Sequence, residues 1–364
     1  MAQNEFEIIK YDCRFFKGSV PCTPNKLYSK ICGDCDLYSP ISTRILIIKL
    51  GALGDVIRST PLVVYFKNTY PGCHITWLTM TPEILLVDEI DVILPFNLQS
   101  MIYLDGHEYD IAVNLDKEAE VCILLEKLKA KLKFGFNWNN NHIDAATPAS
   151  THKLLTGIFD SYSKNNKKSY QEEIFEICQA KFSNEPYLLP LDKKYFNKWE
   201  MLRIEAGVRK IIGLNTGCGK RWQTRLWSFD YWVELINLLK SNNFFPVLLG
   251  GPDEDETNKK LNSITSSYYP GTYSLSEFIA IVAHCDLIVT AVSMMMHIAI
   301  GLQKPLILFN NIFNKNEFEL YGRGVILEPS TGCDCYYGNN CVRDRHCMLD
   351  ITPEMTYKAI MDNT

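Results

Sequence analysis

The feature that most constrains the fold is a buried-type strand followed by a glycine turn and a helical pattern, which occurs twice. The first copy is ILIIKLGALGDVIRSTP at positions 45–61. The second begins with KIIGLNTGCGKRWQTRLW at 210–227 and continues in the amphipathic pattern FDYWVELINLLKSN. Further strands and helices alternate after each copy, which indicates mostly parallel sheets. We therefore expect an α/β protein with two doubly wound units, whose sheets face a cleft lined by the carboxyl ends of their strands.

The chain has 364 residues, which is too many for one ordinary core. We expect an N-terminal domain over 41–195 and a C-terminal domain over 205–328, joined by a linker near 190–205. Two cysteine-rich appendages are expected, one at 1–40 and the other, a finger followed by a C-terminal helix, at 329–364. Residues 137–185 are polar and poorly periodic. They are interpreted either as helices that face a substrate or partner, or as a solvated excursion.

The charge and hydropathy of the chain exclude several classes of protein. The formal net charge is −5, so no strong basic field is available for a dedicated nucleic-acid binder. The chain contains no run of about 18 apolar residues, so no membrane-spanning helix is predicted. The N-terminal residues lack the basic and apolar regions of a secretory signal. We expect a cytosolic protein, which local basic patches could hold at the inner face of the membrane.

The first glycine turn places Gly51 and Gly54 directly before a carboxylate, Asp55. Such a turn brings backbone N–H groups close to a ligand, and the helix that follows favours an anion. At the mouth of a cleft, Asp55 could act as a general base. A second interpretation stays open, in which the glycines only make a tight turn and Asp55 caps the helix.

The second glycine turn concentrates hydroxyl, backbone amide and cationic groups. It holds Thr216, Gly217, Lys220 and Arg225 within ten residues, an arrangement that suits a diphosphate. The alternative is a solvated basic loop. Two tryptophans within the same loop argue against that alternative, because a merely solvated loop seldom carries them.

A third group follows the strand pattern DLIVTA, where Ser293 and His297 stand four residues apart at the start of a helix. That spacing puts both on one helix face, at the strand end where ligands bind in this kind of fold. A histidine on an apolar helix is also explained as a satisfied core residue. The three methionines between them are interpreted as core packing.

The order of these motifs resembles glycosyltransferase family 9, the ADP-heptose heptosyltransferases. The resemblance rests on ILIIKLGALGDVIRSTPL, on GLNTG followed by RLW, on VLLGGPDE, and on Ser293 before HIA. It covers about residues 44–360. It implies a GT-B fold, in which two Rossmann-like domains face a cleft. It also implies an inverting transfer from a nucleotide-diphosphate sugar without a catalytic metal.

The resemblance assigns a role to each candidate residue. Asp55 matches the family's general base, which takes the proton of the attacking acceptor hydroxyl. Arg225 matches a residue that holds the donor phosphates, and Lys220 is a second candidate for that role. These cations and the helix start near Ser293 would stabilise the departing diphosphate.

Four positions bear on recognition of the donor. By the resemblance, Glu254 lies near the ribose, Tyr273 near the nucleobase, and Ser293 and His297 near the phosphates and sugar. The chain departs from the family's Asp-Thr-Gly-x-x-His motif, because Val292 replaces the Asp and Met294 replaces the Gly. The carboxylate expected to bind hydroxyl groups of the donor sugar is therefore missing, so a sugar other than ADP-L-glycero-D-manno-heptose stays open.

Thirteen cysteines are many for a cytosolic protein, and eight of them cluster near the two ends. Because a reducing compartment disfavours disulfides, such clusters indicate structural zinc or iron. Free buried thiols, or disulfides formed after isolation, are the alternative, and His346 is a reserve ligand. The C-terminal set resembles a cysteine-rich finger of many family members and the iron-binding finger of a bacterial autotransporter heptosyltransferase group. The clusters are Cys13, Cys22, Cys32 and Cys35, and Cys333, Cys335, Cys341 and Cys347.

The sequence thus predicts an inverting glycosyltransferase that moves a heptose or related sugar from an ADP-heptose-like donor. The acceptor is a hydroxyl group of lipopolysaccharide, of another surface glycan or lipid-linked glycan, or of a protein, and a homo-oligomer is possible. A non-catalytic sugar-nucleotide-binding or scaffold protein of the same fold is the alternative, favoured by the loss of the motif Asp at Val292. A sugar-nucleotide epimerase is a third class, but the acid and base groups it needs beside the sugar are not placed.

Overall fold

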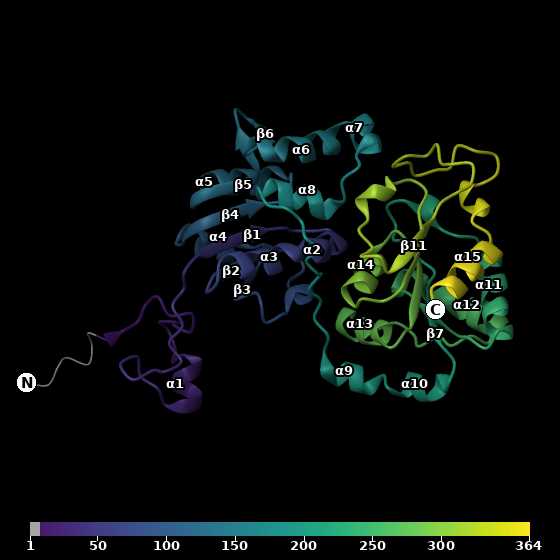
Figure 1. Ribbon diagram of the computed structural model, residues 1–364, viewed down its shortest axis with the longest axis horizontal. Helices are drawn as coiled ribbons and strands as arrows, with labels where there is room; N and C mark the ends of the chain where they lie inside the picture. Colours follow the sequence, from purple (N-terminus) through teal and green to yellow (C-terminus); the bar gives the residue numbers. More distant parts are fainter. Residues whose placement is uncertain (1–7) are drawn as a thin grey trace, which may run out of the picture. The chain divides into compact units, whose positions relative to one another are not determined.

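The computed structural model describes residues 8–364 (Figure 1). The chain forms two compact units that are interleaved in the sequence. Of the described residues, the first unit holds 8–50 together with 62–80 and 88–150. The second unit holds 51–61, 81–87 and 151–364. The glycine turn that contains Asp55 therefore belongs to the same compact unit as the C-terminal half of the chain.

The first unit is built on a six-stranded sheet in the order β3-β2-β1-β4-β5-β6. Neighbouring strands are parallel except for β5 and β6. Residues 45–48 of β1 are fully buried, as expected of a parallel strand that is covered on both faces. The strands are β1 (Arg44–Ile48), β2 (His74–Thr79), β3 (Val92–Pro95), β4 (Glu108–Asn114), β5 (Lys129–Asn139) and β6 (His142–Ala145). The helices are α1 (Thr23–Tyr28), α3 (Pro61–Thr69), α4 (Leu98–Asp105), α5 (Ala119–Lys127) and the 3₁₀ turn η3 (Pro148–Ser150).

The second unit is built on a five-stranded, fully parallel sheet in the order β11-β10-β9-β7-β8. Its strands are β7 (Ile211–Asn215), β8 (Phe245–Leu249), β9 (Leu287–Ala291), β10 (Leu306–Phe309) and β11 (Gly324–Leu327). Helices α13 (Leu275–Ala283) and α14 (Met294–Gly301) cover one face of this sheet, and α11 (Phe229–Ser241), α12 (Asp255–Thr265) and α15 (Pro353–Asp362) cover the other (Figure 1). The helix α2 (Leu53–Ser59) packs against α14 and α8 (Tyr170–Ile177) within this unit.

The remaining elements of the second unit are short. The helices are α6 (Thr151–Ile158), α7 (Asp160–Asn165), α9 (Lys193–Lys198) and α10 (Met201–Ala206). The 3₁₀ turns are η2 (Pro82–Leu85), η4 (Gln223–Arg225), η5 (Pro252–Glu254), η6 (Lys315–Glu317) and η7 (Cys347–Asp350). Within residues 8–364, no helix combines the length and the apolar character needed to cross a membrane.

Several local expectations differ from the structure. The helical pattern after the first glycine turn is divided, because α2 ends at Ser59 and α3 starts at Pro61, whose ring is incompatible with a continuous helix. The polar stretch 137–185 contains the end of β5, the strand β6 and helices α6 to α8. The expected linker near 190–205 carries two short helices. The finger and helix expected at 329–364 pack on the second unit, since Cys347, Met348 and Ile351 lie in the same buried cluster as its core.

Candidate active site

The second unit contains a pocket of about 420 Å³ at the carboxyl ends of β7, β8 and β9. The loops after β7 and β8 and the start of α14 form most of its wall, which is where open parallel sheets bind ligands. The residues Leu53 and Glu83 complete the wall from α2 and η2. The predicted site residues that line this pocket are Gly217, Glu254, Tyr273 and Ser293.

The carboxylate side chain of Glu254, which lines the pocket, lies against three glycines. The backbone N–H of Gly251 donates to Oε2 of Glu254 at 2.9 Å. A Cβ atom on Gly217 would lie 1.9 Å from Oε1 of Glu254, and one on Gly250 would lie 2.6 Å from its Cβ. Both positions therefore require glycine for the side chain of Glu254 to lie against the backbone.

Hydrogen bonds tie the ends of β7 and β9 together beneath the pocket. The side chain of Asn215 donates to the carbonyl of Gly217 at 2.8 Å and to Oγ1 of Thr290 at 2.9 Å. Thr290 in turn contacts Oγ of Ser293 at 3.2 Å. Ser293 is the N-cap residue of α14 without a side-chain capping bond, so the first turn of that helix directs unused backbone N–H groups at the pocket.

The loop after β7 does not present both of its predicted cations. Arg225 is buried, and its guanidinium donates to the carbonyl oxygens of Trp222 (3.0 Å), Cys218 and Val292. Burial lowers the pKa of Arg225. The expectation that Arg225 holds the donor phosphates does not agree with this arrangement, because its donors are used to brace the loop.

Lys220, like its neighbour Arg221, is an exposed cation of this loop. Its ammonium group lies 2.9 Å from the carboxylate of Asp253, and that hydrogen bond raises the pKa of Lys220. Lys220 lines a second hollow of about 380 Å³, which shares Gly217 and Glu254 with the first pocket. Thr216 also lines this hollow, and its buried hydroxyl donates to Oδ1 of Asn258 at 2.7 Å.

The predicted general base lies on the first turn of α2. The carboxylate of Asp55 is one-third exposed and lies 2.8 Å from the guanidinium of Arg58 on the same helix. Arg58 in turn stacks on the ring of Tyr170 from α8, at 3.6 Å from the ring centre. Burial would lower the pKa of Arg58, but the nearby negative charge of Asp55 and other oxygen groups outweighs it and raises that pKa. A permanent cation therefore fixes one side of the Asp55 carboxylate.

His297 lies beneath the first glycine turn and does not line the pocket. A Cβ atom on Gly54 would lie 2.6 Å from Cδ2 of the His297 ring, so only glycine lets α2 pack this closely on α14. Burial lowers the pKa of His297 to about 3, and the charge of Arg58 acts in the same direction. Among the described residues, Nδ1 of His297 has no hydrogen-bond partner. The ring is a neutral packing group at this position.

Two residues of the site were missed by sequence reasoning. Arg58 carried a signal, since it follows Asp55 at the i+3 spacing that pairs charges on a helix. Glu83 carried none, because only the fold brings η2 to the wall of the pocket. Val292, where the family motif has Asp, is buried and offers the pocket no carboxylate. Glu83 and Glu254 are carboxylates that the pocket does present.

The C-terminal cysteines form a compact group in the second unit. Sγ of Cys347 lies 3.8 Å from Sγ of Cys333. Backbone N–H groups donate to two of the sulfur atoms at 3.3 Å, from Cys335 to Cys333 and from Val342 to Cys335. All cysteines of the chain are free thiols. As they are placed across residues 8–364, no three His, Cys, Asp or Glu side chains already surround a point where an ion could sit.

Comparisons with known proteins agree on one family. The family model described as glycosyltransferase family 9 (heptosyltransferase) matches residues 101–316. The lipooligosaccharide heptosyltransferase 2 of Haemophilus influenzae is 22% identical over 345 residues, which cover 87% of this chain and 98% of that protein.

Two solved structures share the fold. The ADP-heptose LPS heptosyltransferase II of E. coli has a TM-score of 0.65 at 17% identity, over 88% of this chain and 98% of that one. The second is the dodecameric, iron-containing heptosyltransferase TibC of enterotoxigenic E. coli, in complex with ADP-D-β-D-heptose. Its TM-score is 0.55 at 14% identity, over 88% of this chain and 75% of that one. The predicted GT-B class with two parallel-sheet domains is confirmed. The cleft between them stays a prediction.

Proposed function

The chain belongs to glycosyltransferase family 9, and on this premise we propose that it transfers a heptose or related sugar with inversion at the anomeric carbon. The proposed donor is an ADP-heptose-like nucleotide-diphosphate sugar. The proposed acceptor is a hydroxyl group of a lipopolysaccharide, of another surface glycan or of a protein. The names of the similar proteins, a lipooligosaccharide heptosyltransferase and an enzyme bound to ADP-heptose, support the choice of donor class.

One observation carries this proposal, namely that Asp55 and the pocket belong to the same compact unit. Leu53, two residues before Asp55 on the same helical turn, lines the pocket itself. A carboxylate is thus held beside a hollow that offers helix N–H groups and glycine-loop amides. This is the combination that a base-assisted displacement of a diphosphate needs.

The chemistry assigned to these residues is a single displacement. Asp55 accepts the proton of the acceptor hydroxyl while the hydroxyl oxygen bonds to the anomeric carbon. The bond between that carbon and the diphosphate oxygen breaks on the opposite face, and the diphosphate leaves with the electron pair. Arg58 orients Asp55 through the ion pair at 2.8 Å. The first turn of α14, the amides around Gly217 and the solvent-facing Lys220 stabilise the charge on the diphosphate.

Recognition of the donor is assigned to the pocket wall. Tyr273 is partly exposed at the pocket, and its ring makes an edge contact with Trp199 at 5.1 Å between the ring centres. The exposed part of the Tyr273 ring is assigned to contact with the nucleobase. Glu254 serves the ribose hydroxyls. Glu83 takes the place of the missing motif carboxylate as an acceptor for hydroxyl groups of the sugar. A donor whose sugar hydroxyls differ from those of the usual heptose is compatible with this exchange.

We also assign a structural zinc or iron ion to Cys333, Cys335, Cys341 and Cys347. Zinc–sulfur bonds of about 2.3 Å in a tetrahedron put neighbouring sulfur atoms about 3.8 Å apart. The distance between Cys333 and Cys347 has this value. The N–H bonds to two of the thiols are of the kind that stabilise thiolates, and the iron-containing relative supports the assignment. Association into a homo-oligomer and contact with a membrane face belong to the same proposal.

The test begins with binding. Thermal shift measurements with ADP, UDP and GDP, and then with their sugars, are expected to give the largest stabilisation with the adenine nucleotides. A transfer assay with ADP-heptose and a lipopolysaccharide core acceptor follows, with the anomeric configuration of the product read by NMR. Retention of configuration, or transfer that is unaffected by loss of Asp55, contradicts the proposal.

The same assays address the non-catalytic alternative, which is favoured by the buried, apolar Val292. A sugar-nucleotide-binding protein is stabilised by the donor but releases no nucleoside diphosphate with any acceptor. A Val292→Asp variant sharpens the distinction. If the protein binds the donor but does not catalyse transfer, restoring the carboxylate is expected to change which sugar nucleotide binds best. Transfer to an acceptor is expected to stay absent in this variant.

A further inference from the structure

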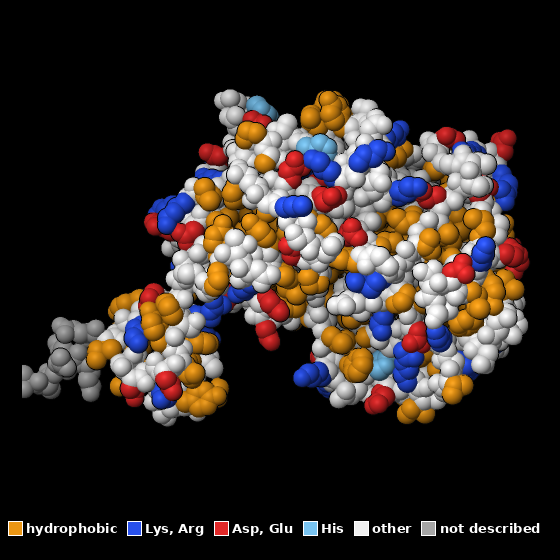
Figure 2. Space-filling view, in the orientation of Figure 1, with side chains coloured by type: hydrophobic (Ala, Val, Ile, Leu, Met, Phe, Trp, Pro, Cys, Tyr) orange, Lys and Arg blue, Asp and Glu red, His pale blue; other side chains and the backbone are white. Residues whose placement is uncertain are grey.

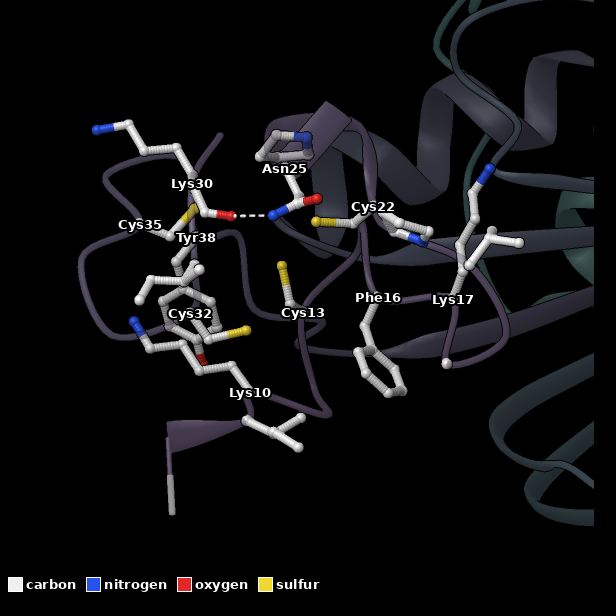
Figure 3. A pocket seen from close by; sticks show the side chains of 16 residues that line it. Lys10, Cys13, Phe16, Lys17, Cys22, Asn25, Lys30, Cys32, Cys35 and Tyr38 are labelled. Carbon is white, nitrogen blue, oxygen red and sulfur yellow. Dashed lines mark hydrogen bonds between the residues drawn. The ribbon is translucent and has the colours of Figure 1, made fainter. Parts of the chain in front are cut away.

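The four N-terminal cysteines come from separate turns but line one hollow. The pocket has a volume of about 360 Å³, and its wall includes Cys13, Cys22, Cys32 and Cys35 (Figure 3). In Figure 3 the thiols of Cys13 and Cys22 are directed at the middle of the pocket. All four are free thiols, and none is used by the proposed transfer reaction.

The backbone is already folded around this pocket. The carbonyl oxygens of three of the four cysteines accept hydrogen bonds from N–H groups three or four residues later, at 2.9 Å for Cys13, 2.9 Å for Cys22 and 3.4 Å for Cys35. The side chain of Asn25 donates to the carbonyl of Lys30 at 2.9 Å and closes the loop between Cys22 and Cys32 (Figure 3). Three of the cysteines thus begin a tight turn, and Cys32 lies within the turn closed by the N–H of Asp34 and the carbonyl of Ile31.

This segment lacks a core of its own. Between residues 8 and 43, Pro24 is the one buried residue of those described, and the regular structure is one six-residue helix and a single bridge from Cys13 to Pro40. Large apolar side chains of this segment instead face solvent, among them Tyr11, Val20, Leu27, Tyr28 and Ile31. Figure 2 shows hydrophobic side chains on the surface of this segment. Segments below about 40 residues need a disulfide, a metal or a partner to hold one conformation.

We propose that Cys13, Cys22, Cys32 and Cys35 bind one thiophilic ion, zinc or iron, as a structural tetrathiolate site. Four thiolates complete a tetrahedral shell, and Cys32 and Cys35 supply the Cys-x-x-Cys pair typical of such sites. Four thiolates around a divalent ion leave an excess negative charge, and the lysines Lys10, Lys17 and Lys30 also line the pocket. As they are placed, the thiols do not yet surround one point. Binding turns them inward about the Cα–Cβ bond, a change between staggered rotamers.

The site would fix the segment to the first sheet. Arg14, next to Cys13, donates to the carbonyl of Cys73 at 2.7 Å and pairs with Asp91, which precedes β3. An ion that orders the turn at Cys13 therefore also holds Arg14 at this sheet. This role is independent of the transfer reaction and of the C-terminal cysteines, and it goes beyond the proposed function.

The experiment measures metal on the full-length protein, purified without chelators and under anaerobic conditions. We expect the Cys32→Ser/Cys35→Ser variant to hold about one metal ion per chain less than the wild type. Elemental analysis identifies the ion as zinc or iron. The reciprocal control is Cys333→Ser/Cys335→Ser, in which the N-terminal ion is retained. Equal metal content in wild type and N-terminal variant overturns the proposal, whatever the C-terminal cysteines bind.

Two measurements on the wild type test the proposal even if the cysteine variant fails to fold. Thiol titration in denaturant with a chelator is expected to count all thirteen thiols, whereas a count lower by four means two disulfides and overturns the proposal. Limited proteolysis with and without a strong chelator is expected to show new cleavage between residues 10 and 40 once the metal is removed. An unchanged cleavage pattern after verified metal loss also overturns it.

Discussion

The two glycine turns occupy equivalent places, after the central strands β1 and β7, but they present opposite chemistry. The turn after β1 holds a carboxylate, Asp55, fixed by a cation from its own helix. The turn after β7 presents backbone amides, while its arginine turns inward to carbonyl oxygens. The same local motif therefore carries a partly exposed carboxylate in one copy and an inward-turned arginine in the other. The two copies differ in the partner of their arginine, which is a carboxylate for Arg58 and backbone carbonyl oxygens for Arg225.

The arginines also differ in what they stabilise. Arg58 stacks on Tyr170 and pairs with Asp55, so its charge acts on the carboxylate of the predicted base. Arg225 neutralises no charge and uses three carbonyl oxygens of the loop backbone. Loss of Arg58 is thus expected to affect chemistry, and loss of Arg225 to affect stability. The predictions below test this contrast in order of decreasing effect.

The largest effect is expected for Asp55→Asn. The amide cannot accept the acceptor proton, so turnover should fall by roughly two or more orders of magnitude while donor binding is unchanged. Steady-state kinetics and a nucleotide thermal shift measure the two quantities. Asp230→Asn, which changes an exposed acid in the first turn of α11, is the control. Normal turnover in Asp55→Asn would remove Asp55 from the mechanism.

The next effect concerns the packing of the first turn. Gly54→Ala places a methyl group 2.6 Å from the His297 ring, which should lower the free energy of unfolding by about 1–3 kcal/mol. Gly51→Ala is the matched control, since a Cβ there meets nothing within 4 Å. Urea denaturation of both variants measures the difference. Equal stability of the two would mean that α2 does not rest on α14 in solution.

For the second turn, Arg225→Lys should lower the free energy of unfolding by about 2 kcal/mol. A lysine cannot reach three carbonyl oxygens at once and leaves buried acceptors unsatisfied. The neighbouring Arg221→Lys, at an exposed position, should be nearly neutral. If Arg225→Lys instead weakens nucleotide binding and leaves stability intact, Arg225 holds phosphate as the family resemblance implies.

The pH dependence of stability should report the buried His297. Its pKa of about 3 in the folded protein lies below the ordinary value of 6.5, so below pH 6.5 the unfolded chain binds a proton that the folded protein does not. The stabilising contribution is present above pH 6.5 and is lost as the pH falls towards 3. Between pH 7 and 5 the loss should be about 1–2 kcal/mol. It should disappear in His297→Gln and persist when the exposed His142 is replaced by Gln.

The smallest effect is expected for Lys220→Ala. This side chain is largely exposed and already paired with Asp253, so its removal should weaken ADP binding by only two- to fivefold, roughly. Lys259→Ala, which breaks a similar exposed pair on α12, should leave binding unchanged. Isothermal titration at two salt concentrations checks both variants. A loss of binding beyond a hundredfold would make Lys220 the main phosphate ligand.

Much of the fold was predictable because it depends on local periodicity. The apolar runs of β1, β2, β4 and of β7 to β10 are short, continuous and bounded by polar or glycine residues. The strand β5 escaped prediction because it is not a continuous apolar run: KAKLKFGFNWN alternates polar or glycine residues with apolar ones, and its three lysines are exposed or half-buried. The break at Pro61 was readable in principle, since proline ends a helix by its own geometry.

The candidate site was predictable only in part. Gly217, Glu254, Tyr273 and Ser293 line the pocket as a group because each follows a strand end or precedes a helix, which the order of motifs reveals. The inward orientation of the Arg225 side chain and the position of Glu83 at the pocket wall depend on segments that are distant in the sequence. Spacing along the chain carries no information about either.

The sequence by itself determined the order of strands and helices, the two glycine turns, and the residue types offered at each, because these depend on neighbours a few positions away. Only the tertiary structure decided which compact unit Asp55 joins, which arginine turns inward to the loop backbone, and that the ring of His297 is a neutral packing group under Gly54. The placement of each charged or titratable side chain depends on which side chains from remote segments pack around it and exclude water. That exclusion arises only when the segments pack together.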